Sequence, residues 1–111
     1  MNLNSIGFFQ FDNLIKNRIP FVLINLTQKP VKIYSQSLYQ QHLTQVEVMT
    51  TTTEVLPNLN TRQHPKHEAL LVLCEDGSHS PALVQELEQS GYLNVFYVEG
   101  GLSSLMADAL R

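Results

Sequence analysis

The chain has 111 residues, of which 43% are hydrophobic and 15% charged, and its formal net charge is −3. This length suits one compact domain over residues 1–111. The acidic balance disfavours nucleic acid and anionic membranes as partners, because both require clustered positive charge. No apolar run approaches the roughly 20 residues of a bilayer span, and Met1–Gln10 lacks the basic residue that opens a signal peptide.

The N-terminal part of the chain predicts two short helices around a strand. Apolar residues at helical spacing indicate a helix over Phe11–Arg18, which Pro20 ends. Phe21–Ile24 is a continuous apolar run, typical of a strand buried on both faces. Ser35 or Ser37 can cap a second short helix.

A second strand is predicted over Val46–Met49, and a threonine run follows it. Thr51 and Glu54 have the spacing of a capping box, so we expect a helical turn that stops near Pro57. The polar segment Asn58–Lys66 is predicted to be a loop.

The last third of the chain has the clearest pattern. Ala69–Leu73 is another fully apolar strand, which ends at Cys74, and the segment Glu75–His79 is a tight polar loop. Ser80 is a good N-cap and Pro81 a good first helical residue. Gly91 supplies a left-handed end for the helix that follows.

The pattern then closes with Val95–Val98 as a strand, a break at Gly100–Gly101, and an amphipathic helix over Leu102–Leu110. Apolar strands that alternate with short helices predict βαβ units, hence a parallel sheet covered on both faces. In such sheets ligands bind beyond the carboxyl ends of the strands. Cys74 follows a predicted strand directly, so it lies at such an end.

The segment Cys74–Ser80 has the features of a loop that can hold an anion. Several backbone N–H groups at the start of a helix lack helical partners and can converge on one point. Gly77 permits a positive φ angle and a close backbone approach. The helix N-terminus favours a thiolate over a thiol. This combination suits a nucleophilic cysteine that carries an anionic adduct such as a persulfide.

These residues resemble the rhodanese-like sulfurtransferase family, in which a strand ends in the catalytic cysteine and a Cys-x-x-Gly-x-x-Ser loop leads into a helix. Cys74, Gly77 and Ser80 match that loop one for one. Other segments resemble the family's remaining signatures: Phe21–Leu26, Tyr39–Leu43, Gly91–Val95 and Glu99–Leu102.

The resemblance implies a three-layer α/β rhodanese-like domain with a mostly parallel sheet and helices on both faces. It implies a sulfurtransferase or persulfide carrier that uses Cys74 as its catalytic nucleophile. The persulfide-binding loop would consist of Glu75, Asp76, Gly77, Ser78, His79 and Ser80. No cofactor and no metal are expected. The implied partners are a sulfane sulfur donor and a protein or small-molecule acceptor, and a homodimer is compatible with the weakly charged surface.

The chain also departs from the family pattern. Asn25 and Thr27 replace an aspartate and an arginine after the first strong strand. Glu75 stands where a basic residue is common, and His79 where an arginine is. Carboxylates beside Cys74 disfavour a thiolate and repel the dianion thiosulfate. The alternative function is therefore a degenerate rhodanese-like binding module without sulfurtransferase activity.

Three other functions are disfavoured by the residues present. A phosphatase of related fold needs an arginine six residues after the cysteine, where this chain has Ser80. A thioredoxin-like role needs a second cysteine, and the single Cys74 also excludes internal disulfides and polycysteine zinc sites. A single thiol fits a reducing cytoplasm. His64 and His67 lack a third metal ligand, and we expect both in an exposed loop.

Overall fold

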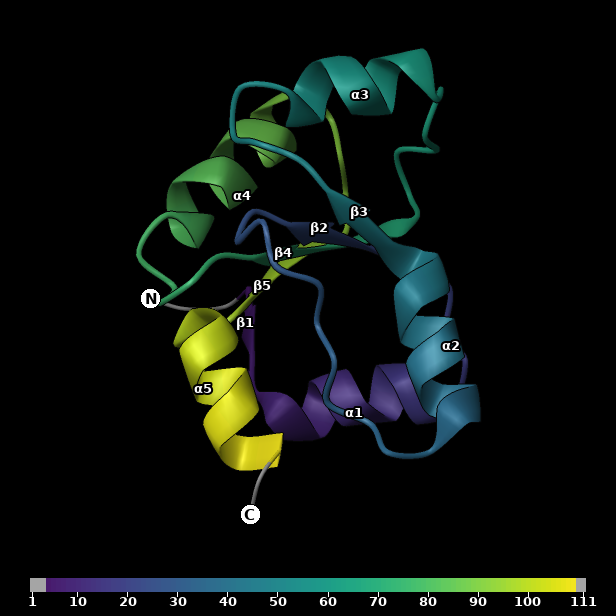
Figure 1. The fold of residues 1–111 in the computed structure, drawn as a ribbon. Coiled ribbons are helices and arrows are strands. Elements are labelled where there is room, and N and C mark those ends of the chain that lie inside the picture. The colour runs from purple at the N-terminus through teal and green to yellow at the C-terminus, as the bar shows by residue number, and fades with distance from the viewer. Residues whose placement is uncertain (1–3, 110–111) are drawn as a thin grey trace.

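The computed structural model describes residues 4–109. Its centre is a five-stranded, all-parallel sheet in the spatial order β1-β5-β4-β2-β3 (Figure 1). The strands are β1 (Ser5–Ile6), β2 (Phe21–Asn25), β3 (Glu47–Met49), β4 (Ala69–Leu73) and β5 (Val95–Val98). The predicted parallel sheet is confirmed.

Helices cover both faces of the sheet and complete three layers (Figure 1). One face carries α1 (Phe8–Lys16), α2 (Ser37–Val46) and α5 (Gly101–Ala109), and the other carries α3 (Val55–Thr61) and α4 (Ser80–Gln89). This arrangement confirms the predicted three-layer α/β architecture. None of the helices within residues 4–109 has the length and apolar character needed to cross a bilayer.

The strand β2 shows why the central strands are continuous apolar runs. Phe21 and Leu23 enter the core under α1, α2 and α5, whereas Val22 and Ile24 enter the core under α3 and α4. All five residues of the strand are buried. A strand with helices on both faces has no solvent face, so a polar residue at every second position would be left in a core.

The first helix and the first strand differ from the prediction. The helix begins at Phe8, not Phe11, because the side chain of Gln10 accepts a hydrogen bond from Gly7 N–H at 3.0 Å and closes the first turn. The strand Ser5–Ile6 was not predicted. It has only two residues, which is too few for a recognisable alternation of polar and apolar side chains.

Two boundaries in the middle of the chain were also predicted differently. The helix α2 follows Gln36 as its N-cap and runs through Val46, so β3 begins one residue later than predicted.

At the C-terminal end of the chain, Leu110 was expected in the last helix and lies outside the described residues.

The largest error is the predicted loop Asn58–Lys66, because α3 occupies Val55–Thr61. Pro57 was expected to stop this helix. It lies instead in the first turn, where a backbone N–H has no helical partner and proline is tolerated. Val55 and Leu59, one turn apart, are both buried against the sheet, so the apolar face holds the helix in place.

Candidate functional site

Cys74 lies immediately after β4, the middle strand of the sheet, at its carboxyl edge. The sulfur accepts two hydrogen bonds, one from the backbone N–H of Gly77 and one from the hydroxyl of Ser80, each 3.1 Å long. Gly77 has a φ of 88°, which turns its N–H back toward the sulfur. Cys74 is 3% exposed, so the sulfur sits at the bottom of the loop. Both donors are placed where they can also donate to a thiolate.

Ser80 differs from its predicted role. We expected an N-cap that reaches a ligand through its backbone, but His79 is the N-cap and Ser80 is the first residue of α4. The side chain of Ser80 is fully buried, and its hydroxyl bonds to the sulfur of Cys74 instead of to the helix. Pro81 follows in the first turn, where its missing N–H is not needed.

The Cys74 loop is closed from the other side by the start of α5. Leu102 N–H donates to the carbonyl of Cys74 at 2.8 Å, and Ser103 N–H donates to the carbonyl of Glu75 at 3.0 Å. Gly101, with a φ of 66°, lies against the same loop. A side chain there would overlap Cys74 O and Gly77 N. Gly101 therefore lets the start of α5 and the loop after β4 pack directly together.

A cavity of about 450 Å³ opens next to Cys74. Loops after three adjacent parallel strands form it, as the rule for carboxyl ends of strands requires. Of the residues predicted for the site, Cys74, Glu75 and His79 line this cavity, whereas Asp76 and Ser78 do not. The remaining lining residues were not predicted: Leu26, Thr27, Gln28, Thr51 and Thr52. Leu26, Thr27 and Gln28 come directly after β2, and Thr51 and Thr52 come shortly after β3. Their position after a strand is the sequence signal that could have identified them.

Gln28 connects two of these loops. Its side-chain amide donates to the carbonyl of Thr50 at 2.9 Å, which links the loop after β2 to the loop after β3. Its φ of 64° places a residue with a side chain in the left-handed region. Such strain persists where the surrounding contacts fix the backbone.

Asp76 is occupied within its own turn. The hydroxyl of Ser78 donates to its carboxylate at 2.6 Å and the backbone N–H of Ser78 at 3.0 Å. These hydrogen bonds hold the pKa of Asp76 below its ordinary value. The negative charge of Asp76 is thus directed to the turn and not to the cavity.

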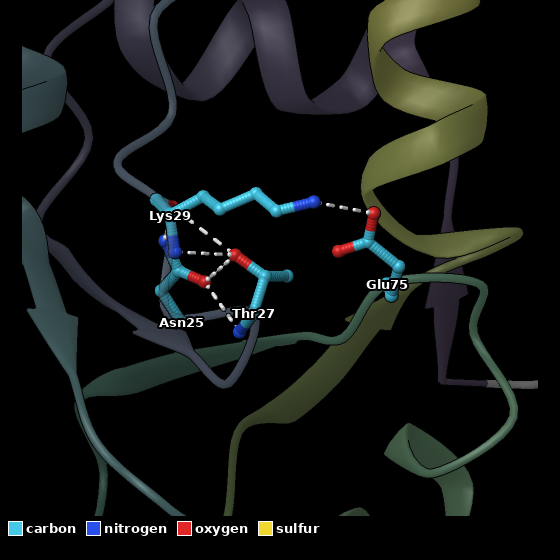
Figure 2. A network of polar contacts seen from close by, with 4 residues as sticks. All are labelled: Asn25, Thr27, Lys29 and Glu75. Atoms are coloured by element: carbon cyan, nitrogen blue, oxygen red, sulfur yellow. Dashed lines mark hydrogen bonds and ion pairs between the residues drawn. The ribbon is translucent and has the colours of Figure 1, made fainter.

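Glu75 is paired with a lysine that sequence analysis did not identify. Lys29 Nζ lies 3.3 Å from Glu75 Oε1, and Figure 2 shows the lysine reaching from the loop after β2 toward the Cys74 loop. The two side chains are 67% and 53% exposed. An exposed pair of this kind is weak. It still places a positive charge beside the carboxylate that was expected to oppose a thiolate.

Asn25, at the end of β2, holds the loop that carries Lys29 (Figure 2). Its side-chain amide donates to the carbonyl of Lys29 at 2.7 Å. Its carbonyl oxygen accepts the backbone N–H of Thr27 at 2.9 Å and the hydroxyl of Thr27 at 2.7 Å. Asn25 is completely buried. The residue that replaces the family's aspartate therefore organises this loop from below.

His64 lies elsewhere and differs from its prediction. It is 9% exposed and packs against Tyr92 with 6.2 Å between the ring centres, whereas His67 is exposed as expected. The backbone N–H of His64 donates to the carbonyl of Leu59, a buried residue of α3, at 3.0 Å, which holds His64 close to the core. Within residues 4–109, no three histidine, cysteine or acidic side chains are grouped so that they could hold a metal ion.

Comparison with solved structures shows a rhodanese-like fold. Thiosulfate sulfurtransferase from Pseudomonas aeruginosa superposes with a TM-score of 0.72 at 14% identity, over 96% of this chain and 19% of that one. A rhodanese-like domain protein from Staphylococcus aureus gives 0.66 at 21% identity, over 93% of this chain and 91% of that one. An NAD-dependent persulfide reductase from A. fulgidus gives 0.60 at 18% identity, over 90% and 15%.

The chain thus spans less than a fifth of the Pseudomonas and A. fulgidus proteins, but nearly the whole of the Staphylococcus one. No protein-family model and no curated protein sequence matches the chain. The likeness is therefore one of fold.

Proposed function

We propose that this chain is a rhodanese-like sulfurtransferase or persulfide carrier, with Cys74 as its only nucleophile. The observation that carries the proposal is the pair of 3.1 Å hydrogen bonds that Gly77 N–H and the Ser80 hydroxyl donate to the sulfur. Donors already aimed at the sulfur stabilise charge without reorganisation. An inert core cysteine surrounded by aliphatic groups would not need them.

The proposed chemistry is a sulfur exchange in two balanced steps. The Cys74 thiolate attacks the outer sulfur of a donor persulfide, R–S–SH. The S–S bond of the donor breaks, its electron pair leaves with R–S⁻, and Cys74 becomes a persulfide. An acceptor thiolate then attacks the outer sulfur of that persulfide and regenerates the Cys74 thiolate. No cofactor, oxidant or reductant takes part in either step.

The charges around Cys74 favour a persulfide over thiosulfate as the donor. Thiosulfate carries a sulfonate directly on the sulfur that is attacked, and no arginine or lysine among the described residues lines this cavity to bind it. Its lining is instead three threonines, a glutamine and Leu26, together with Glu75 and His79 beside Cys74. A thiol that must stay reduced fits the cytoplasm as the compartment.

The comparisons support this proposal at the level of fold. The similar structures include one named a thiosulfate sulfurtransferase and one named a persulfide reductase. Because a fold can host several functions, the loop chemistry and not the likeness must decide the activity.

A binding module without chemistry is the second candidate, and one observation favours it. Cys74 is 3% exposed, and an attacking donor must reach it through the cavity. If the cavity does not admit a persulfide, the fold can serve only as a surface for a partner.

Mass spectrometry of the intact protein separates the two candidates. The purified chain is incubated with a small persulfide donor, and its mass is compared with that of Cys74→Ser treated in the same way. A gain of one sulfur atom that thiols remove, present only with Cys74, supports sulfur transfer. An unchanged mass in both proteins, with Cys74 still present as a thiol, supports the binding module instead.

A further inference from the structure

A second cavity, of about 330 Å³, shares the lining residue Glu75 with the cavity beside Cys74. Its lining includes the apolar side chains of Pro30, Leu102 and Met106, together with Ser103, Lys29 and Lys32. Together the two cavities have the size range that small-molecule sites usually have. Glu75 thus lies between the cavity beside Cys74 and the second cavity, which has Lys29 and Lys32 in its lining.

Little free energy is needed to separate Glu75 from Lys29. The ion pair between Lys29 and Glu75 is exposed to solvent and consists of one contact of 3.3 Å between Nζ and Oε1. Such a pair contributes little to stability. Lys32 is exposed and forms no ion pair with any of the residues 4–109. A ligand carboxylate can therefore bind Lys32 directly and replace Glu75 in the Lys29–Glu75 pair that Figure 2 shows.

The two cavities differ in the charge they accept. The sulfur cavity is lined largely by uncharged side chains, whereas the second cavity holds two lysines against one glutamate. A matching ligand has an uncharged part around its reactive sulfur and a carboxylate some distance away. Thiosulfate differs, because its charge lies on the reacting sulfur and on the sulfonate attached to it.

We propose that Lys29 and Lys32 form a carboxylate-binding subsite for a small peptide thiol persulfide whose outer sulfur reaches Cys74. This inference rests on the proposed function, since the ligand is the donor in the exchange described above. The lysines hold the donor and take no part in the chemistry, so they are specificity-determining residues and not catalytic ones.

The test compares glutathione persulfide with the persulfide of glutathione diethyl ester, which lacks both carboxylates. Single-turnover addition of sulfur to Cys74 is followed by intact mass. The wild type is expected to react about five- to tenfold faster with the acid than with the ester at low donor concentration. Lys29→Gln/Lys32→Gln loses this preference. Lys16→Gln removes one charge on α1, away from both cavities, and keeps it.

A binding measurement separates failure of this inference from failure of the proposed function. S-methylglutathione carries the carboxylates but no transferable sulfur, and it is titrated into the wild type and the double lysine variant by NMR. Shifts at the amides of Lys29 and Lys32 that vanish in the variant support the subsite, whether or not Cys74 reacts. Equal rates for acid and ester, or no shifts in the wild type, overturn the subsite. If neither donor modifies Cys74, the proposed function fails.

Discussion

Asn25 Nδ2 lies 2.6 Å from Glu47 Oε2, so the amide at the end of β2 donates to the first side chain of β3. The same carboxylate oxygen accepts the backbone N–H of Val31 at 3.0 Å. A carboxylate accepts hydrogen bonds but donates none. Glu47 therefore requires a donor at position 25, which explains why asparagine stands where the family pattern has aspartate.

Replacing this asparagine with its isosteric acid is expected to destabilise the fold. In Asn25→Asp a second carboxylate faces Glu47 and the carbonyl of Lys29, with no proton to share. We expect a loss of about 3 kcal/mol in the free energy of unfolding, measured by urea denaturation at neutral pH. The double variant Asn25→Asp/Glu47→Gln removes the repulsion between the two carboxylates and should recover only part of the loss, because the N–H of Val31 and the carbonyl of Lys29 cannot both regain their partners. An Asn25→Asp protein as stable as the wild type would contradict this account of the pair.

The hydroxyl of Ser80 is expected to control how reactive Cys74 is. Ser80→Ala removes one of the two donors to the sulfur, and with it a hydrogen bond that can stabilise charge on the attacking atom. We expect alkylation of Cys74 by iodoacetamide at neutral pH to slow roughly tenfold. Ser78→Ala is the matched control, because its hydroxyl bonds to Asp76 and not to the sulfur. Equal slowing in both variants would mean that loop order, and not the hydrogen bond, sets the rate.

A methyl group at Gly101 is expected to disrupt the contact between α5 and the Cys74 loop. The Cβ of Gly101→Ala would overlap Cys74 O and Gly77 N, both backbone atoms that cannot swing away. We expect a loss of about 3 kcal/mol, from the positive φ and the overlap together.

Gly91→Ala provides the comparison, since Gly91 also has a positive φ but its nearest neighbour atom would lie 3.9 Å from the added Cβ. Its expected cost is about 1 kcal/mol. Thermal or urea unfolding of both variants tests the difference, and equal losses would remove the steric part of the explanation.

His42 is expected to make stability depend on pH. Burial, with a smaller contribution from the charge of Arg18, lowers the pKa of His42 below 6.5 in the folded chain. The unfolded chain therefore takes up the proton first, and folding stability that is complete above pH 6.5 is lost as the pH falls below it. His42→Gln should flatten this part of the curve of unfolding free energy against pH.

The exposed His67 supplies the control for that measurement. His67→Gln is expected to leave the slope unchanged. If the two variants show the same slope as the wild type, protonation of His42 is not linked to unfolding.

The sequence alone predicted the central strands of the sheet well, but it missed the edge strand β1 and most of α3, and both outcomes have physical reasons. The runs Phe21–Ile24 and Ala69–Leu73 are buried on both sides, so composition alone marks them as central strands. Ser5–Ile6 pairs at the edge through two residues, which leaves no pattern to detect. Pro57 misled the prediction of α3 because a proline stops a helix in its interior but not in its first turn.

The residues around the sulfur were predictable to the extent that they are local. Gly77 and Ser80 lie within six positions of Cys74 and belong to one loop. Lys29 meets Glu75 across 46 positions of chain, and only the order of the strands brings them together. The threonines that line the cavity follow the ends of β2 and β3, but only the order of the strands shows that those ends lie beside Cys74.

The amide protons of Leu102 and Ser103 are bonded to carbonyls of the Cys74 loop and not to their own helix. Their exchange with solvent deuterium can proceed only when that loop separates from α5. The exchange rates of these two protons therefore report how often the loop separates from α5. They can be measured with the sulfur free, persulfidated or alkylated, without any label attached to the chain.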